Sequence, residues 1–430
     1  MPELDRHDRT WRFVQTAFPW TQAPTTDALR EMAEQVRVTL WVDDDLAHSA
    51  QAYLTTLATI NIVGRLPASL AIGAPEGSRR LHVPPYRGET LHAAVADLCK
   101  RLDRPIDIST PGQKKGLTVQ IDTPGESHSW QLATKGWTAY MGGDTVPWSD
   151  VYNPAAAYFV GCMIGGEVLR AWARGTAQEG LGRPGPSFAS RTRPASDRWV
   201  NLWAPDTDLP GPQADASSLP AIDWVGAGAV NQATLAVIAA TPGWEPAGSV
   251  TDPKLLDLPD LNRSLLSFLE DVHKPKALVA AKEAAEGHLP GIYARYPRKQ
   301  NPETAPWIVA GTDDVRVRSE IQRLWPRRLV VTATEGVFGY VAWHAPERAD
   351  IPCAGCGTTD GLDSEDRIPT SAPTSTAAGV VTASTLLRLA SGENAPSRTD
   401  ILTLRLDTTN ALDSSNPSPT PGCETCRTRP

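Results

Sequence analysis

The chain carries two pairs of cysteines with C-x-x-C spacing, and these pairs constrain its fold more than any other feature. Cys353 and Cys356 form one pair, and Cys423 and Cys426 form the other close to the C-terminus. Four thiolates from two such turns make a closed tetrahedral Zn²⁺ site, which is typical of structural zinc. Paired C-x-x-C units in a chain without an export signal favour a metal over disulfides. The alternative is two independent reactive dithiols.

Length and charge set broad limits on what the chain can be. Its 430 residues predict two domains of about 200 residues each, and the formal net charge is −8 without a long basic run. We therefore expect no nucleic-acid partner, because binding to a phosphate backbone needs a basic face. The sequence lacks a run of about 18 apolar residues, and residues 1–20 are charged rather than signal-like. These features predict a cytoplasmic protein with no membrane partner.

The domain boundary is expected in the segment richest in proline and glycine, at 181–220. We predict an N-terminal domain at 1–185, a linker at 186–214 and a C-terminal domain at 215–430. A second stretch of the same kind, at 410–422, is predicted to be a loop or arm.

A nucleotide-binding unit is predicted directly after the linker. In the segment 221–243 a short apolar strand runs into Gly226-Ala-Gly228, and an alanine-rich helical pattern follows. Glycines at such a turn let the backbone approach a phosphate, and the helix N-terminus supplies N–H donors. Asn231 stands where the usual fingerprint has a third glycine, so any βα turn remains an alternative. Asp252 follows the next predicted strand and could bind a ribose, as it would in a dehydrogenase also.

Two cations with fixed spacing, Arg263 and Lys276, lie in the next segment. The order of the acidic strand end, "DLNRS" at 260–264 and "HKPK" at 273–276 resembles the ThiF/MoeB/ubiquitin-activating enzyme superfamily. Members of that superfamily activate C-terminal carboxylates with ATP. The resemblance implies that Arg263 and Lys276 hold the triphosphate, with Asn262 beside it and Asp252 on the ribose.

Two residues of this segment depart from the superfamily pattern. Asp260 stands where an asparagine is usual, and Ser264 stands where a glutamine is usual.

The segment 307–322 resembles the superfamily's next signature, an apolar strand that ends in an aspartate-containing turn. Here the turn reads Thr312-Asp313-Asp314. A carboxylate at the C-terminal end of a strand and facing the phosphates suits Mg²⁺, so the resemblance makes Asp313 the magnesium ligand. The alternative for Asp313 is a helix N-cap. The strand and glycine-containing hairpin that usually follow are expected at 327–345.

A crossover loop is expected between the two cysteine pairs, at 357–378. The superfamily ties its zinc in the same way and often places a catalytic cysteine in this loop, where the present chain has Ser375. Either the reaction stops at the adenylate, or Ser375 or a neighbouring threonine, Thr374 or Thr376, takes the acyl group as an oxyester. A flexible polar loop is an equal alternative.

The two remaining cysteines, Cys99 and Cys162, lie in helical and apolar patterns of the first half. Buried packing is the better interpretation for both.

The first half is predicted to be an inactive copy of the second. Residues 36–64 read as strand, turn and helix, but the turn is Asp43-Asp44-Asp45, whose carboxylates would repel a triphosphate. The segment 153–175 resembles the helix after the superfamily's crossover loop. One half of such a pair lends an N-terminal arginine to the other's ATP, and Arg12 is the candidate by resemblance, with Arg9 as the alternative.

The fold that the resemblance implies is α/β: a Rossmann-like adenylation fold in two pseudo-symmetric halves, with mixed sheets flanked by helices. The implied reaction is ATP- and Mg²⁺-dependent adenylation of the C-terminal carboxylate of a ubiquitin-like protein ending in glycine. Transfer to a conjugating-enzyme-like partner would follow, and a homodimer is conceivable. The alternatives are adenylation of a precursor peptide in natural-product biosynthesis, and a zinc-stabilised binding scaffold without activity. A dehydrogenase would leave Arg263, Lys276 and the four cysteines unexplained.

Overall fold

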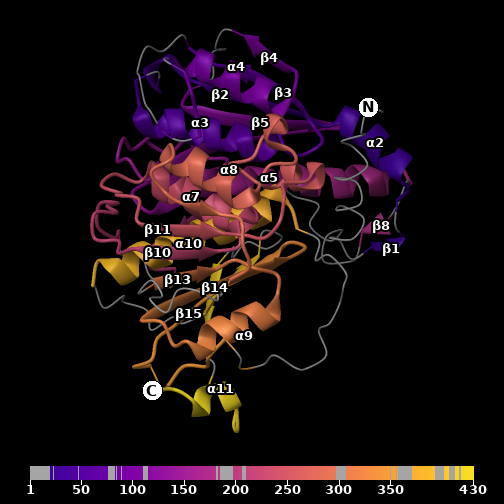
Figure 1. The fold of residues 1–430 in the computed structure, drawn as a ribbon. Helices are drawn as coiled ribbons and strands as arrows, with labels where there is room; N and C mark the ends of the chain where they lie inside the picture. Colours follow the sequence, from indigo (N-terminus) through magenta and orange to yellow (C-terminus); the bar gives the residue numbers. More distant parts are fainter. Residues whose placement is uncertain are drawn as a thin grey trace.

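The computed structural model consists of two mixed β-sheets with helices between and around them (Figure 1). The element order confirms the predicted Rossmann-like α/β organisation in two halves. The residues that the structure describes are 20–22, 24–46, 48–75, 83, 85–88, 90–109, 115–180, 183–184, 197–205, 210–296, 307–348, 350–354, 356, 370–392, 401–405, 412–415 and 418–430.

The sheet of the C-terminal half has eight strands in the order β12-β11-β10-β13-β14-β15-β16-β17. The first five of these run parallel, and β15 to β17 continue the sheet in antiparallel fashion. The central strand β13 is buried along its whole length and is a continuous apolar run rather than an alternating one. The strands are β10 (Ile222–Val225), β11 (Gly248–Thr251), β12 (Gly291–Ile292), β13 (Trp307–Ala310), β14 (Arg328–Glu335), β15 (Phe338–His344), β16 (Ile401–Arg405) and β17 (Leu412–Ser415).

The helices of this half include a long buried one, α10, which begins with Pro373 in its first turn and is capped by Ser371. Proline in the first turn does not disturb a helix, because its missing N–H would be unsatisfied there anyway. The helices are α7 (Ala229–Ala240), α8 (Lys276–Ala285), α9 (Val315–Arg323), α10 (Ala372–Ala390) and α11 (Glu424–Arg427), with the 3₁₀ turns η2 (Leu258–Asn262) and η3 (Leu269–Asp271).

The N-terminal half has a seven-stranded sheet in the order β4-β3-β2-β5-β6-β7-β9. Only β4, β3 and β2 are parallel, and β5 lies antiparallel beside β2, where the other half has the parallel strand β13. The strands are β2 (Arg37–Val42), β3 (Ser69–Gly73), β4 (Ile106–Ser109), β5 (Leu117–Thr123), β6 (Glu126–Lys135), β7 (Thr138–Gly142) and β9 (Arg198–Asn201); β1 (Trp20–Gln22) and β8 (Arg183–Pro184) form a separate pair.

The helices of the N-terminal half are α2 (Thr26–Gln35), η1 (Asp44–Leu46), α3 (Ala50–Val63), α4 (Leu91–Leu102) and α5 (Pro154–Gln178). The predicted strand, aspartate turn and helix at 36–64 correspond to β2, η1 and α3, and the predicted helix at 153–175 is α5. The repeated order of strand and helix, β2-α3-β3-α4-β4 against β10-α7-β11-α8-β12, makes the two halves pseudo-symmetric.

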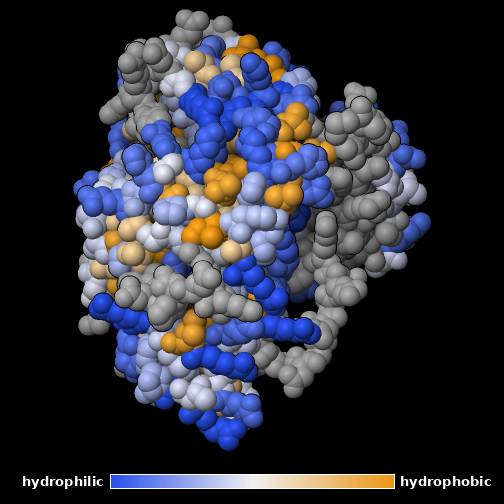
Figure 2. Space-filling model, viewed as in Figure 1, coloured by the Kyte–Doolittle hydropathy of each residue, from blue (hydrophilic) through white to orange (hydrophobic). Residues whose placement is uncertain are grey.

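The two halves share one hydrophobic core, in which α5 packs against α10. Gly165 of α5 lies so close to Pro373 of α10 that a Cβ atom there would be 2.3 Å from Cγ of the proline. Glycine is therefore required at this contact, since any side chain would push the helices apart. On the outside, Figure 2 shows a face in which hydrophilic residues dominate and apolar ones form small groups.

Two segments predicted as a loop or a linker contain strands. The stretch at 410–422 includes β17, which pairs with β16. The segment predicted as the linker, 186–214, contains strand β9, which pairs with β7 and so belongs to the first sheet. After β9 the chain stays on the protein: the Trp137 indole N–H donates to the Pro212 carbonyl at 2.6 Å. The connection is thus largely structured where it is described, and the domain boundaries remain a prediction.

Within the described residues, no helix combines the length and the apolar character needed to cross a membrane.

Candidate active site

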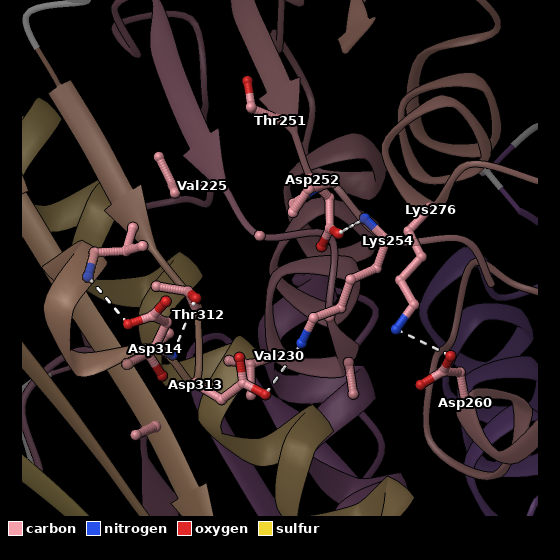
Figure 3. Close-up of a pocket in the computed structure, with 18 of the residues that line it drawn as sticks. Val225, Val230, Thr251, Asp252, Lys254, Asp260, Lys276, Thr312, Asp313 and Asp314 are labelled. Carbon is pink, nitrogen blue, oxygen red and sulfur yellow. Dashed lines mark hydrogen bonds and ion pairs between the residues drawn. The ribbon is translucent and has the colours of Figure 1, made fainter. Parts of the chain in front are cut away.

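A pocket of about 660 Å³ opens at the carboxyl ends of the parallel strands β10, β11, β13 and β14 (Figure 3). Loops that leave neighbouring parallel strands diverge there, so this edge is where α/β sheets bind ligands. The predicted residues Gly226, Gly228, Asp252, Arg263, Lys276, Asp313 and Ser375 all line the pocket. Arg12 and Arg9 lie outside the described residues.

The glycine turn between β10 and α7 is built for close approach of the backbone. Gly226 has a φ of +85°, a conformation that favours glycine, and an added Cβ would be 3.1 Å from the Gly311 carbonyl oxygen. Gly228 is the N-cap of α7, and within the described chain no side chain caps this helix. The first N–H groups of α7 are therefore available to an anion in the pocket.

Asn231, which departs from the glycine fingerprint, stabilises this turn. Its side-chain amide donates to the carbonyls of Val225, at 3.1 Å, and Gly226, at 2.7 Å. A Cβ on Gly311 would be only 2.3 Å from Asn231 Oδ1, so a bare backbone must face this side chain. Asn231 thus fixes the position of helix α7 against the turn by hydrogen bonds, whereas a third glycine would allow the helix to pack closely on the strand.

Asp252 follows β11 and is buried, with 6 % of its surface exposed. Oδ2 accepts from the Ala227 amide in the glycine turn at 2.7 Å, and Oδ1 accepts from the Lys254 amide at 2.7 Å. A carboxylate has about four acceptor positions, so both oxygens retain a lone pair for a ligand. The carboxylate joins the ends of β10 and β11 at the wall of the pocket.

The two predicted phosphate ligands lie on either side of Asp260. Lys276 Nζ is 2.9 Å from Asp260 Oδ2, and Arg263 Nη2 is 3.6 Å from Asp260 Oδ1. Arg263 also donates to Asn262 Oδ1 at 3.1 Å. The Asp260 carboxylate, which departs from the superfamily pattern, thus neutralises much of the positive charge that Arg263 and Lys276 bring to the pocket. We call Asp260, Arg263 and Lys276 the clamp.

The turn after β13 separates the two roles that the sequence left open for Asp313. Asp314, not Asp313, caps α9, because its Oδ1 accepts from the amides of Arg316, at 2.9 Å, and Val317, at 3.3 Å. The Asp313 side chain is 70 % exposed and lies 3.4 Å from Lys254 Nζ. It is therefore free of the helix cap and available to a hydrated cation.

Lys254 is a pocket residue that the sequence reading missed. It lies two residues after Asp252, and its ammonium is the partner of Asp313 across the pocket (Figure 3). Its position two residues after Asp252 could have indicated from the sequence that Lys254 belongs to the site. Arg318 of α9 also lines the pocket and donates to the Thr312 carbonyl and, at 3.1 Å, to the Tyr340 hydroxyl.

The predicted crossover loop at 357–378 is wrong in its second part. Residues 372–378 form the start of helix α10, and residues 357–369 lie outside the described chain. Ser375, Thr374 and Thr376 are fully buried in this helix. The Ser375 hydroxyl is 2.9 Å from that of Thr370, although Ser375 borders the pocket. A helix and a buried hydroxyl are less suited to carry an acyl group than an exposed loop.

The two cysteines of the first half are buried, as the sequence predicts. Burial raises the pKa of Cys99 to about 12 and raises that of Cys162 well above its ordinary value. The thiolate is the nucleophilic form, so neither residue is suited to accept an acyl group.

The four remaining cysteines come together as predicted. Their sulfur atoms lie within 4.8 Å of one another, with Sγ–Sγ distances of 3.7 Å for Cys353–Cys356, 3.6 Å for Cys353–Cys423 and 3.4 Å for Cys356–Cys426. Zn–S bonds of about 2.3 Å place the sulfurs of a tetrahedral site about 3.8 Å apart, so the geometry fits Zn²⁺. The cluster joins the segment after β15 to the C-terminal helix α11.

Comparison with known proteins gives a likeness of fold. No family model matches the sequence, and no curated protein matches it. The fold is similar to that of E. coli MccB. A structure of MccB with ATP is 15 % identical with a TM-score of 0.41, and the match covers 69 % of this chain and 97 % of that one. A structure of the microcin C7 biosynthetic enzyme MccB in complex with N-formylated MccA is 13 % identical, with the same TM-score and coverage. At this identity and TM-score the similarity concerns the fold alone, and any conclusion about the reaction must come from the residues of the pocket.

Proposed function

We propose that the protein is an ATP-dependent adenylyltransferase that activates the C-terminal carboxylate of a peptide. One observation carries the proposal: the pocket at the strand ends combines a glycine turn, the buried carboxylate of Asp252, the partly buried cations Arg263 and Lys276, and the exposed carboxylate of Asp313. A dehydrogenase site would need the first two features only. Arg263, Lys276 and Asp313 are the groups that a triphosphate with its metal ion requires.

The nucleotide is expected to lie with its phosphates along the N-terminus of α7. The N–H groups after Gly228 and the dipole of the helix favour negative charge at this end. Asp252 would accept hydrogen bonds from the ribose hydroxyls with the lone pairs that Ala227 and Lys254 leave open.

In the proposed reaction, a carboxylate oxygen of the peptide attacks the α-phosphorus of ATP. The bond from the α-phosphorus to the bridging oxygen breaks, and pyrophosphate leaves with that electron pair. The chain contributes positioning and neutralisation of the charge that builds up on the phosphate oxygens, through Arg263 and Lys276. Asp313 would hold Mg²⁺, and the ion would supply neutralisation of the negative charge on the phosphates.

Among carboxylate substrates, the arrangement at Ser375 favours a reaction that ends at the peptidyl adenylate. Its hydroxyl is buried in α10 and bonded to a threonine hydroxyl, which is not a base at neutral pH. Adenylation of a precursor peptide in natural-product biosynthesis therefore fits better than the transfer chain of a ubiquitin-like protein. The second candidate, oxyester formation on Ser375 followed by a conjugating-enzyme-like partner, is supported by one fact, that Ser375 borders the pocket.

The test is ATP–pyrophosphate exchange with a library of peptides that have free C-terminal carboxylates, and the same peptides with amidated C-termini as the control. We expect exchange with the free peptides only, and loss of exchange in Lys276→Ala and in Asp313→Ala while zinc content stays unchanged. Undiminished exchange in both variants would contradict the proposal, as would exchange with the amidated peptides.

A further inference from the structure

Within the described residues, the N-terminal half does not line the pocket. All pocket-lining residues of the described chain lie at or beyond Val225 in the sequence. Two arginines of the N-terminal half nevertheless contact the segments that carry the clamp. Arg65 follows α3 and is 4 % exposed, and Arg101 lies in the last turn of α4 and is 7 % exposed. Arginine is rarely buried to this degree unless it is paired, so the partners of these two residues are informative.

Arg65 binds the backbone of the segment that contains Arg263. Its guanidinium donates to the carbonyls of Leu261, Leu265 (3.2 Å) and Ser267 (3.2 Å). Asn61, one turn earlier in α3, accepts from Arg65 Nε at 3.1 Å and donates to the Leu265 carbonyl at 3.2 Å. The three carbonyls flank Asn262, Arg263 and Ser264 on both sides, so one planar guanidinium determines the course of this part of the backbone.

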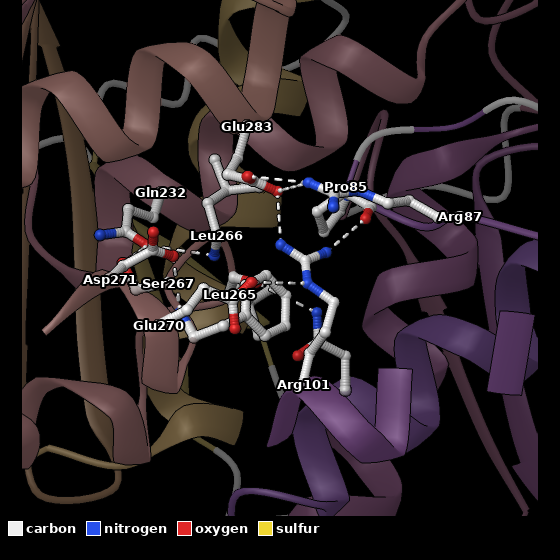
Figure 4. Close-up of polar contacts among 12 residues, drawn as sticks. Pro85, Arg87, Arg101, Gln232, Leu265, Leu266, Ser267, Glu270, Asp271 and Glu283 are labelled. Atoms are coloured by element: carbon white, nitrogen blue, oxygen red, sulfur yellow. Dashed lines mark hydrogen bonds and ion pairs between the residues drawn. The ribbon is translucent and has the colours of Figure 1, made fainter. Parts of the chain in front are cut away.

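Arg101 contacts both segments that carry the clamp residues, helix α8 and the chain after Arg263 (Figure 4). It pairs with Glu283 of α8 at 2.7 Å and with Glu270 at 3.4 Å, and its guanidinium carbon lies 3.5 Å from the centre of the Phe268 ring. Helix α8 begins at Lys276, and Phe268 belongs to the segment after Arg263. Through Arg101 the N-terminal half thus holds α8, which carries Lys276, next to the segment that carries Arg263.

A continuous chain of hydrogen bonds extends from this segment to the glycine turn. Gln232 Oε1, on α7, accepts from the Leu266 amide and from the Ser267 hydroxyl, both at 3.0 Å. Gln232 Nε2 donates to the Ala227 carbonyl at 3.0 Å, and the Ala227 amide donates to Asp252. Gln232 is fully buried, so neither end of this connection can be replaced by water without cost.

We propose that Arg65 is a positioning residue for the nucleotide phosphates, acting across the boundary between the halves through the 261–267 backbone and Gln232. The proposal rests on the proposed function, because it assigns Arg65 to the same nucleotide site. Under this proposal the N-terminal half contributes to the reaction by fixing the geometry of the clamp and of the glycine turn.

The experiment compares Arg65→Lys with Arg388→Lys. Arg388 of α10 is buried to the same degree, with 5 % of its surface exposed, and donates to the Trp203 carbonyl at 2.8 Å, away from the pocket and from the 261–267 segment, so it is a matched control. Lysine keeps the charge and cannot form the fork of hydrogen bonds. Calorimetry with MgATP and with adenosine is the readout. We expect Arg65→Lys to weaken MgATP binding about tenfold and adenosine binding less than twofold, because adenosine lacks phosphates. Arg388→Lys should change neither by more than about twofold.

A second variant covers the case in which Arg65→Lys does not fold. Gln232→Met is neutral and of similar size, and it removes both the acceptor for Leu266 and Ser267 and the donor to the Ala227 carbonyl. It is expected to weaken MgATP binding in the same selective way. Equal loss of adenosine and MgATP affinity, or an unchanged MgATP affinity in both variants, would overturn the proposal.

Hydrogen exchange separates this proposal from the proposed function. Arg65→Lys should speed amide exchange in the 261–267 segment of the nucleotide-free protein, and Arg388→Lys should not. If the native protein binds no MgATP, the proposed function fails, and the exchange rates alone decide whether Arg65 holds this segment. Unchanged exchange there would refute the positioning role whatever the nucleotide result.

Discussion

Asp260 and Lys276 form an ion pair, with Oδ2 of the aspartate 2.9 Å from Nζ of the lysine, at the wall of the pocket where the triphosphate is expected. The Asp260 side chain is 14 % exposed and that of Lys276 is 11 % exposed. The pair is therefore only partly screened by solvent. A phosphate that approaches Lys276 must compete with this carboxylate.

Asp260→Asn is accordingly expected to tighten MgATP binding about tenfold, because it removes a negative charge beside the phosphates. The free energy of unfolding should fall by about 1 kcal/mol, since two cations lose their partner. Calorimetry and denaturant titration measure the two effects. Asp271→Asn is the control, because Asp271 accepts from the Phe268 amide, pairs with Lys274 and does not line the pocket. Weaker MgATP binding in Asp260→Asn would show that the carboxylate assists the clamp rather than competing with the nucleotide.

Lys254 should matter for nucleotide binding and little for stability. Its ion pair with Asp313 joins two side chains that are 59 % and 70 % exposed, and such pairs contribute at most about 1 kcal/mol. Lys254→Met is expected to raise the KM for ATP about tenfold while the free energy of unfolding changes by less than about 0.5 kcal/mol. Lys282→Met, an exposed lysine of α8 outside the pocket, provides the control. Equal kinetics in the two variants would exclude Lys254 from the site.

Ser375→Ala distinguishes the two fates of the adenylate. If the reaction ends at the peptidyl adenylate, exchange with pyrophosphate should stay within about twofold of the native rate, because the buried hydroxyl touches only its Thr370 partner in the described contacts. Ser384→Ala removes a similarly buried hydroxyl of α10 that bonds to the Val380 carbonyl, and controls for loss of stability. A hydroxylamine-labile, DTT-resistant conjugate that disappears only in Ser375→Ala would instead favour transfer of a ubiquitin-like protein.

Removal of zinc should loosen the C-terminal end of the chain. The cluster joins Cys353 and Cys356 to α11, and Gln322 of α9 accepts from the Ala354 amide inside the first C-x-x-C turn at 2.9 Å. Metal analysis should find one zinc per chain. Cys426→Ser should lose the metal and lower the melting temperature, because the free energy of metal binding contributes to folding. Cys99→Ala should keep the metal, since that thiol lies elsewhere in the core. Equal zinc content in both variants would disprove the site.

His344 predicts a specific dependence of stability on pH. Its Nδ1 donates to the Pro352 carbonyl at 2.7 Å, and burial lowers the pKa of the imidazole to about 4. The unfolded chain, with a pKa of about 6.5, binds the proton first, so stability is full above about pH 6.5 and is lost as the pH falls towards 4. Between pH 7.5 and 5 the loss should be about 2 kcal/mol.

The control for this pH effect is His344→Asn, which keeps a donor at the Nδ1 position and does not titrate. Denaturant titration of both proteins at each pH isolates the histidine, because all other groups are common to the pair. Parallel stability curves between pH 7.5 and 5 would show that His344 is not responsible.

Local features of the chain could be predicted from the sequence because their causes lie within a few residues. Gly226 marks the strand-to-helix turn because its φ of +85° favours glycine. The cysteine cluster could be predicted because two C-x-x-C turns supply the four thiols of a tetrahedral zinc site. The strand, aspartate turn and helix at 36–64 follow from apolar patterning alone.

Only the tertiary structure decided which groups face one another across elements that are distant in the sequence. It placed Asp260 between Arg263 and Lys276, and it buried Ser375 in α10, where a polar loop was expected. It also brought Arg65 to the backbone beside Arg263, nearly two hundred residues away in the chain. Hydrogen bonds of this kind depend on how α3, α7 and α10 pack. Packing is determined by the whole core, whereas a sequence motif is determined by its own residues.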